Sequence, residues 1–144
     1  MINKIHELIL TFFFSGYVSP FPGTLASLIT LIICFFIPSQ FLLFLAAIIL
    51  IVSFYSCYLY SENSDIKDPS FIVIDEVIGM MISLLFIQKK IVLYIIAFLL
   101  FRFFDIMKPS FINHSQKLKY GIGIVADDFI SGVLVILIMY NIYL

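Results

Sequence analysis

The chain is poor in charge and has no tryptophan at all. Only 12% of its 144 residues are charged, whereas a soluble domain has about 25%. That scarcity excludes an ordinary water-soluble globular domain. Apolar residues take the place of charged ones. Of all residues, 63% are hydrophobic, and the mean hydropathy is +1.19. We therefore expect an integral membrane protein with one domain, residues 1–144.

Basic runs and a cysteine framework are also missing. Eight basic residues oppose nine acidic ones, and no cluster of Lys and Arg predicts a nucleic-acid partner. The two cysteines, Cys34 and Cys57, lie in apolar runs and are too few for a disulfide framework or a zinc site. Neither is followed six residues later by the Arg of a Cys-based phosphatase. We expect both to be packing residues.

Short polar breaks divide the apolar sequence into segments of helix length. These patterns predict an all-α membrane bundle of about six helices, some of them short or interfacial. Loops are expected at 16–24, 61–70, 88–90 and 108–120, with Ser39 a possible N-cap after Pro38. The expected helices are 5–14 (interfacial), 25–37, 40–60, 71–87, 91–107 and 121–144.

Five acidic residues lie inside these apolar segments, where a carboxylate at a helix centre costs roughly 2.5–3.5 kcal/mol. A purely structural membrane helix gains nothing from them, so their presence indicates function. Carboxylates are the ligands of hard cations, and the simplest hypothesis is a metal site. The five residues are Asp75, Glu76, Asp105, Asp127 and Asp128.

If each segment crosses the membrane, alternation brings all five carboxylates within about two helical turns of the same side. That side also has more lysines than the other, which has only Lys89 and Lys90. By the positive-inside rule the carboxylate side is cytoplasmic. The lysines that favour this orientation are Lys67, Lys108, Lys117 and Lys119.

The Asp75–Glu76 pair has two interpretations. Neighbours on a helix point about 100° apart, so one carboxylate can ligate a cation while the other serves as second ligand or base. Alternatively, the pair is a solvated helix end. Gly79, one turn further on, would allow close approach of another helix or of a lipid headgroup.

Arg102, Asp105 and Lys108 recur every three residues and so lie on neighbouring turns of one helix. An Arg102–Asp105 ion pair would lower the cost of both charges. In the functional interpretation, Arg102 and Lys108 donate to a phosphate while Asp105 holds a metal. The two interpretations are compatible.

The last acidic pair, Asp127–Asp128, has no basic residue near it in sequence, which favours a metal role. Upstream, Gly23 and Thr24 sit where a helix should begin, and helix N-termini bind phosphate. The alternative for Thr24 is plain N-capping. His6 and His114 have no evident partner and are not assigned to the site.

Four motifs in order resemble the phosphatidylglycerophosphatase A family, over nearly the whole chain. They are GYVSPFPGTLAS, IDEVIGM, FRFFDIMKP and GIGIVADD. The resemblance implies a Mg²⁺-dependent lipid phosphatase with an all-α fold. Its substrate would be phosphatidylglycerophosphate, whose terminal phosphomonoester is hydrolysed to phosphatidylglycerol and phosphate.

By matching position, the resemblance gives roles to individual residues. The catalytic residues would be Asp75, Glu76, Asp105, Asp127 and Asp128. Of these, the expected Mg²⁺ ligands are Glu76, Asp105, Asp127 and Asp128. Arg102, Lys108, Gly23 and Thr24 would bind the substrate phosphate. The expected location is the bacterial inner membrane, multi-pass, with the site facing the cytoplasm and membrane lipid as the partner.

Two other functions compete. A small transporter or channel subunit would use the carboxylates to carry protons or cations, and would need charges through the whole depth of the membrane. A CDP-alcohol phosphotransferase would need a D-G-x-x-A-R run, which is absent, as is the D-x-D-x-T of soluble phosphatases.

Overall fold

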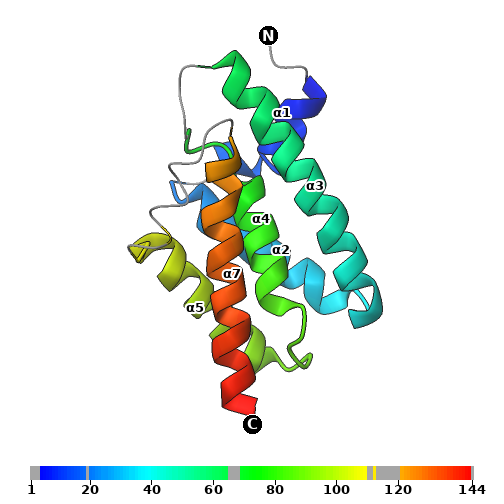
Figure 1. The fold of residues 1–144 in the computed structure, drawn as a ribbon. Helices are drawn as coiled ribbons and strands as arrows, with labels where there is room; N and C mark the ends of the chain where they lie inside the picture. Colours follow the sequence, from blue (N-terminus) through cyan, green and yellow to red (C-terminus); the bar gives the residue numbers. More distant parts are fainter. Residues whose placement is uncertain (1–3, 19, 65–68, 110–111, 113–120, 144) are drawn as a thin grey trace.

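A computed structural model of the chain describes residues 4–18, 20–64, 69–109, 112 and 121–143. Within these ranges there are six α-helices, one short 3-10 helix and no strand, which confirms the predicted all-α class (Figure 1). The helices are α1 (Lys4–Leu10), η1 (Ser15–Tyr17), α2 (Pro22–Phe36), α3 (Ser39–Asn63), α4 (Ile74–Leu84), α5 (Ile91–Met107) and α7 (Ile122–Tyr143).

Helix α4 is the core of the bundle. It contacts α2, α3, α5 and α7, and it packs most extensively along α7. Every residue of α4 except Glu76 is buried. Because protein surrounds it on all sides, α4 is apolar all round, apart from the acidic pair in its first turn.

The contact between α4 and α7 depends on two glycines. A Cβ added at Gly132 would lie 2.5 Å from the backbone oxygen of Gly79, and one at Gly79 would lie 2.8 Å from the backbone oxygen of Asp128. No side chain fits there, so the two helix backbones touch. A helix or a lipid headgroup is expected to approach Gly79 closely, and in the structure it is a helix, α7.

The outside of the bundle is apolar where a soluble protein would be polar. Two of the described helices, Ser39–Asn63 and Ile122–Ile142, are long and apolar enough to cross a membrane. Only 28% of the most apolar stretch of α3 is buried inside the bundle, so most of this helix faces outward. Its exposed residues include Phe41, Phe44, Ile48, Ile51 and Tyr55. A lipid environment accounts for such a surface.

Several predicted boundaries need correction. Helix α2 begins at Pro22 rather than Leu25, because a proline is pre-organised for the first helical position. The N-caps of α2 and α3 are Phe21 and Pro38, and neither makes a side-chain capping bond. Thr24 and Ser39 are thus already inside their helices, and the two capping predictions are wrong.

Three helix lengths also differ from the sequence predictions. The predicted span 71–87 contains a helix of only 11 residues, α4, about 17 Å long. Helix α3 extends three residues beyond the predicted end, to Asn63. The first helix stops at Leu10 because the chain then turns through positive φ angles at Phe12, Phe13 and Phe14.

Among the described residues, the 88–90 turn and the acidic residues lie at opposite ends of the bundle, as predicted. At one end, the Lys89 ammonium donates to the backbone oxygen of Phe35, at 2.9 Å, and to that of Ile37. The 88–90 turn is thereby fixed to the last turn of α2. The starts of α2, α4 and α7 and the end of α5 meet at the opposite end, which holds the acidic residues.

Candidate functional site

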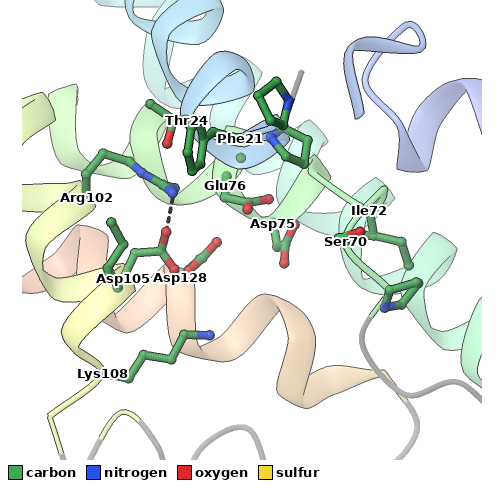
Figure 2. A pocket seen from close by; sticks show the side chains of 15 residues that line it. Phe21, Thr24, Ser70, Ile72, Asp75, Glu76, Arg102, Asp105, Lys108 and Asp128 are labelled. Carbon is green, nitrogen blue, oxygen red and sulfur yellow. Dashed lines mark ion pairs between the residues drawn. The ribbon is translucent and has the colours of Figure 1, made fainter. Parts of the chain in front are cut away.

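A cavity of about 540 Å³ opens where these four helix ends meet. Figure 2 shows carboxylates from three helices gathered in it, with Arg102 and Lys108 approaching from two sides. The convergence predicted from the order of segments is confirmed for the residues that line the cavity. The lining consists of Pro20, Phe21, Pro22, Gly23, Thr24, Pro69, Ser70, Ile72, Asp75, Glu76, Arg102, Asp105, Ile106, Lys108 and Asp128.

Three of the carboxylates form a tight cluster. One oxygen each from Asp75, Glu76 and Asp128 lies within 4.8 Å of the other two. Asp75 Oδ1 and Glu76 Oε2 are buried and have no hydrogen-bond partner among the described residues. Buried carboxylate oxygens without donors are costly, and a cation among them would offset both the desolvation and the repulsion. The geometry therefore fits a hard divalent cation.

This cluster shares two residues with the predicted ligand set and differs from it in the others. Glu76 and Asp128 are in it, as expected of metal ligands, and Asp75 is the third member. Asp105 and Asp127 lie next to the cluster, but each also forms an ion pair with a cation. The metal roles predicted for Glu76, Asp105, Asp127 and Asp128 all stay predictions.

The predicted Arg102–Asp105 ion pair is present. An Arg102 nitrogen lies 2.5 Å from Asp105 Oδ2, between side chains that are both mostly buried. The pair leaves Arg102 Nε buried without a hydrogen-bond partner in the described part of the chain. Because Arg102 lines the cavity, it can pair with Asp105 and still donate to an anion there.

Lys108 forms the second ion pair, with its Nζ 2.6 Å from Asp127 Oδ2. The sequence has no basic residue close to this acidic pair, but the fold brings one to Asp127. Its partner lies nineteen residues away in the chain, a distance that local inspection does not reveal. Burial alone would lower the pKa of Lys108, but the carboxylate of Asp127 raises the pKa above its usual value.

The backbone at Lys108 is unusual. This residue ends α5 in the left-handed conformation, with φ 39° and ψ 68°, which a lysine rarely adopts. The turn redirects the chain immediately after the helix, and the Lys108 side chain then reaches α7. Strain of this kind persists where the surrounding structure fixes the residue, and it is common at functional sites.

The start of α2 closes the cavity from another side. Gly23 and Thr24 lie in its first turn, where backbone N–H groups have no partner within the helix. A Cβ at Gly23 would lie 2.0 Å from Glu76 Oε1, so only glycine allows this carboxylate to approach the helix. The positive end of the α2 dipole thus faces both Glu76 and the cavity.

The N-terminal segment holds the start of α4 in place. The backbone N–H of Val73 donates to the Leu10 carbonyl at 2.9 Å. The ring of Phe71 packs against Tyr17 and Tyr60, at centroid distances of 5.5 and 5.9 Å. These contacts fix the chain just before Asp75 and so fix the direction in which the acidic pair points.

Sequence reasoning missed the apolar and neutral residues of the cavity. Phe21, Ser70, Ile72 and Ile106 carry no charge, so nothing marked them against an apolar background. Their one signal was position, since Phe21 lies inside the Pro-Phe-Pro-Gly-Thr motif and Ile106 follows Asp105.

Comparison with known proteins points to one family. The family described as phosphatidylglycerophosphatase A matches residues 8–143. The chain is 32% identical to the phosphatidylglycerophosphatase A of Haemophilus influenzae, over 99% of this chain and 90% of the relative. It is 31% identical to the protein of the same name from Escherichia coli, over 97% and 84%.

A relative from Bacteroides thetaiotaomicron has a different name. It is 38% identical, over 88% of this chain and 86% of its own length, and is provisionally named a phosphatidylinositol-3-phosphatase. The search of solved structures found no match.

Proposed function

Since this chain belongs to the phosphatidylglycerophosphatase A family, we propose that its substrate is phosphatidylglycerophosphate and that its activity depends on Mg²⁺. The chain is a phosphoric monoester hydrolase. The reaction would release the terminal phosphate and leave phosphatidylglycerol. The observation that supports this proposal most directly is a carboxylate cluster and two cationic side chains in one cavity.

Asp75, Glu76 and Asp128 are the residues that would hold Mg²⁺. Their clustered carboxylate oxygens, two of which (Asp75 Oδ1 and Glu76 Oε2) have no partner among the described residues, supply the hard, anionic ligands that this ion prefers. When bound, the ion would neutralise the cluster, polarise a phosphoryl oxygen and make a bound water more acidic. Without a cation, this many carboxylates would repel the substrate phosphate.

Arg102, Lys108 and the first turn of α2 would bind the phosphoryl oxygens. Arg102 lines the cavity, and Lys108 keeps its proton because Asp127 stabilises the ammonium. Asp105 and Asp127 would act by orienting these two cations. Donors held in place in this way stabilise charge as it develops on the equatorial oxygens.

The hydrolysis itself needs a base and an acid. We propose that water attacks phosphorus in line and gives one proton to a carboxylate of the cluster. The bond between phosphorus and the glycerol oxygen breaks, and that oxygen takes a proton from solvent water to leave as the alcohol, while the carboxylate returns its proton to solvent, so that one water is consumed. Carboxylates are suitable proton acceptors in such a step when they lie within hydrogen-bond reach of the water.

The location of the site supports a lipid substrate. All the described intramembrane charges gather at one end of the bundle, whereas a transporter would need them through its depth. We place this end at the cytoplasmic face of the bacterial inner membrane. Of the lysines that favour this orientation, Lys67, Lys117 and Lys119 lie outside the described residues.

The test is phosphate release by the purified full-length protein from a panel of lipids. Phosphatidylglycerophosphate, phosphatidylinositol 3-phosphate and phosphatidic acid would each be assayed with Mg²⁺ and with excess EDTA. We expect turnover of phosphatidylglycerophosphate only with Mg²⁺. Full activity in EDTA would overturn the metal proposal. Preference for the inositol lipid, suggested by the name of the Bacteroides relative, would overturn the substrate proposal.

A further inference from the structure

The cavity has an apolar rim as well as a charged floor. Phe21 and Ile106 both line it, yet their exposed fractions are 71% and 68%. None of the six charged residues that line the cavity is exposed to that degree, since each of them is buried or half-buried. Phe21, which precedes α2, lies beside Thr24 (Figure 2), and Ile106 lies in the last turn of α5. The cavity therefore borders directly on surface that faces away from the bundle.

On α5, exposed apolar residues continue from this rim along one face. Their spacing of three or four residues keeps them on the same side of the helix. Along α2, beyond Phe21, exposed apolar residues likewise recur at helical spacing. On α5 the exposed residues are Val92, Ile95, Leu99, Phe103 and Ile106, and on α2 they are Leu28, Ile32 and Phe36. We refer to these eight residues and Phe21 as the α2–α5 outer face.

The two helices are antiparallel neighbours. The start of α2 and the end of α5 both line the cavity. At the opposite end, the rings of Phe35 on α2 and Tyr94 on α5 are 5.4 Å apart. The two helices therefore run side by side from the cavity to their far ends, and each carries an exposed apolar row.

We infer that the α2–α5 outer face binds the diacylglycerol part of the substrate, and that Phe21 and Ile106 contact it where it enters the cavity. The inference rests on the proposed lipid phosphatase function. The acyl chains would stay in the bilayer while the phosphate reaches Arg102 and Lys108 sideways.

The dimensions agree with this assignment. From Ile106 to Val92, α5 rises about 21 Å at 1.5 Å per residue. One leaflet contributes about half of a hydrocarbon core of roughly 30 Å, so the face is long enough for a complete acyl chain. The outer face of α3 is equally apolar, but none of its residues line the cavity. Continuity with the charged site distinguishes the α2–α5 outer face from other lipid-facing surface.

The kinetic test compares substrates that differ only in acyl-chain length. The double variant Phe21→Ala/Ile106→Ala would be assayed on short-chain and long-chain phosphatidylglycerophosphate. The control is Phe44→Ala/Ile51→Ala on α3, which removes the same residue types at exposures of 68% and 70%. We expect the rim variant to lose about tenfold in kcat/KM on the long-chain lipid, mainly through KM, and much less on the short-chain one.

The outcomes separate this inference from the proposed function. If wild type hydrolyses the lipid and the rim variant matches the α3 control at both chain lengths, the lipid-binding face is wrong and the function stands. If wild type hydrolyses neither lipid, the proposed function fails.

If wild type hydrolyses neither lipid, a photocrosslinking measurement still tests whether the α2–α5 outer face binds the lipid. Benzoylphenylalanine in place of Phe103, or of Phe44 as control, would be photolysed with radiolabelled phosphatidylglycerophosphate. Labelling at position 103 should fall when unlabelled phosphatidylglycerophosphate competes, and should persist with phosphatidylglycerol, which lacks the monoester. Equal labelling and equal competition at both positions would overturn the inference.

Discussion

Asp127 and Asp128 are sequence neighbours with different surroundings. Asp127 is paired with Lys108 at 2.6 Å, while Asp128 belongs to the cluster with Asp75 and Glu76. Both are almost completely buried, with exposed fractions of 2%. The first carboxylate thus has a structural partner in the protein, and the second is surrounded by like charge. Substitution should affect the two residues differently.

For Asp128→Asn we expect turnover to fall by orders of magnitude without loss of stability in the absence of metal. Removing this charge relieves repulsion with Asp75 and Glu76 and a desolvation cost. Thermal unfolding in detergent checks this, with and without Mg²⁺. Wild type should gain stability from the ion and the variant should not. A lower midpoint without metal would contradict the metal-ligand role.

Asp127→Asn should lower the thermal midpoint even without metal. The substitution leaves the half-buried ammonium of Lys108 without its charged partner, which costs about 1–3 kcal/mol. Activity should fall as well, because Lys108 is no longer held at the cavity. Glu62→Gln is the control, since this exposed carboxylate lies outside the site and bonds only Tyr58 among the described contacts. An unchanged midpoint for Asp127→Asn would show that the ion pair contributes nothing to stability.

At the level of elements, the site is assembled by helix ends. Asp75 and Glu76 come from the first turn of α4, Asp128 from the second turn of α7, and Arg102 and Asp105 from the last turns of α5. The distance between α4 and α7 sets the size of the carboxylate cluster. That distance is set by Gly79 and Gly132, where backbone meets backbone.

Gly132→Ala should therefore damage both stability and catalysis. Its new methyl group would lie 2.5 Å from the Gly79 oxygen, so α7 must move away from α4 and carry Asp128 with it. Overpacking of this kind costs typically about 1–3 kcal/mol. Thermal unfolding and kcat measure the two effects. Leu137→Ala, on the exposed side of the same helix, is the control. A variant with wild-type kcat would show that this helix contact does not set the site geometry.

At the level of the whole molecule, helices of very different length share one bundle. Helix α3 is about 37 Å long, whereas α4 is about 17 Å and cannot by itself span a core of roughly 30 Å. Protein surrounds α4, so its ends need not match the membrane surface. In Figure 1, the end of α3 extends beyond the start of α4, the helix whose first turn contains Asp75 and Glu76.

Cysteine labelling tests how the bundle sits in the membrane. Asn63, at the end of α3, and Gln88, in the turn before α5, are both exposed and lie at opposite ends. In a Cys34→Ala/Cys57→Ala background, Asn63→Cys should be labelled only from the cytoplasmic side and Gln88→Cys only from the other side. Labelling of both from one side would contradict a transmembrane bundle with a single functional end.

The sequence by itself determined the helical segments and the chemistry of the site. Apolar runs of helix length, interrupted at Pro38 and at the 88–90 turn, leave few alternatives to a membrane bundle, because buried backbone must bond within each segment. Carboxylates such as Asp75 and Asp128 stood out because hydrocarbon penalises charge. The order of the segments also predicted that these residues would meet at one end.

Only the tertiary structure decided which charges from different helices are partners. Asp75 and Asp128 are far apart in the chain, and their proximity depends on the rotation and spacing of α4 against α7. The pairing of Lys108 with Asp127 depends on a left-handed turn that no local sequence pattern predicts. The rim formed by Phe21 and Ile106 was invisible for another reason. An apolar residue in an apolar sequence has no distinguishing chemistry until the fold places it beside a charged cavity.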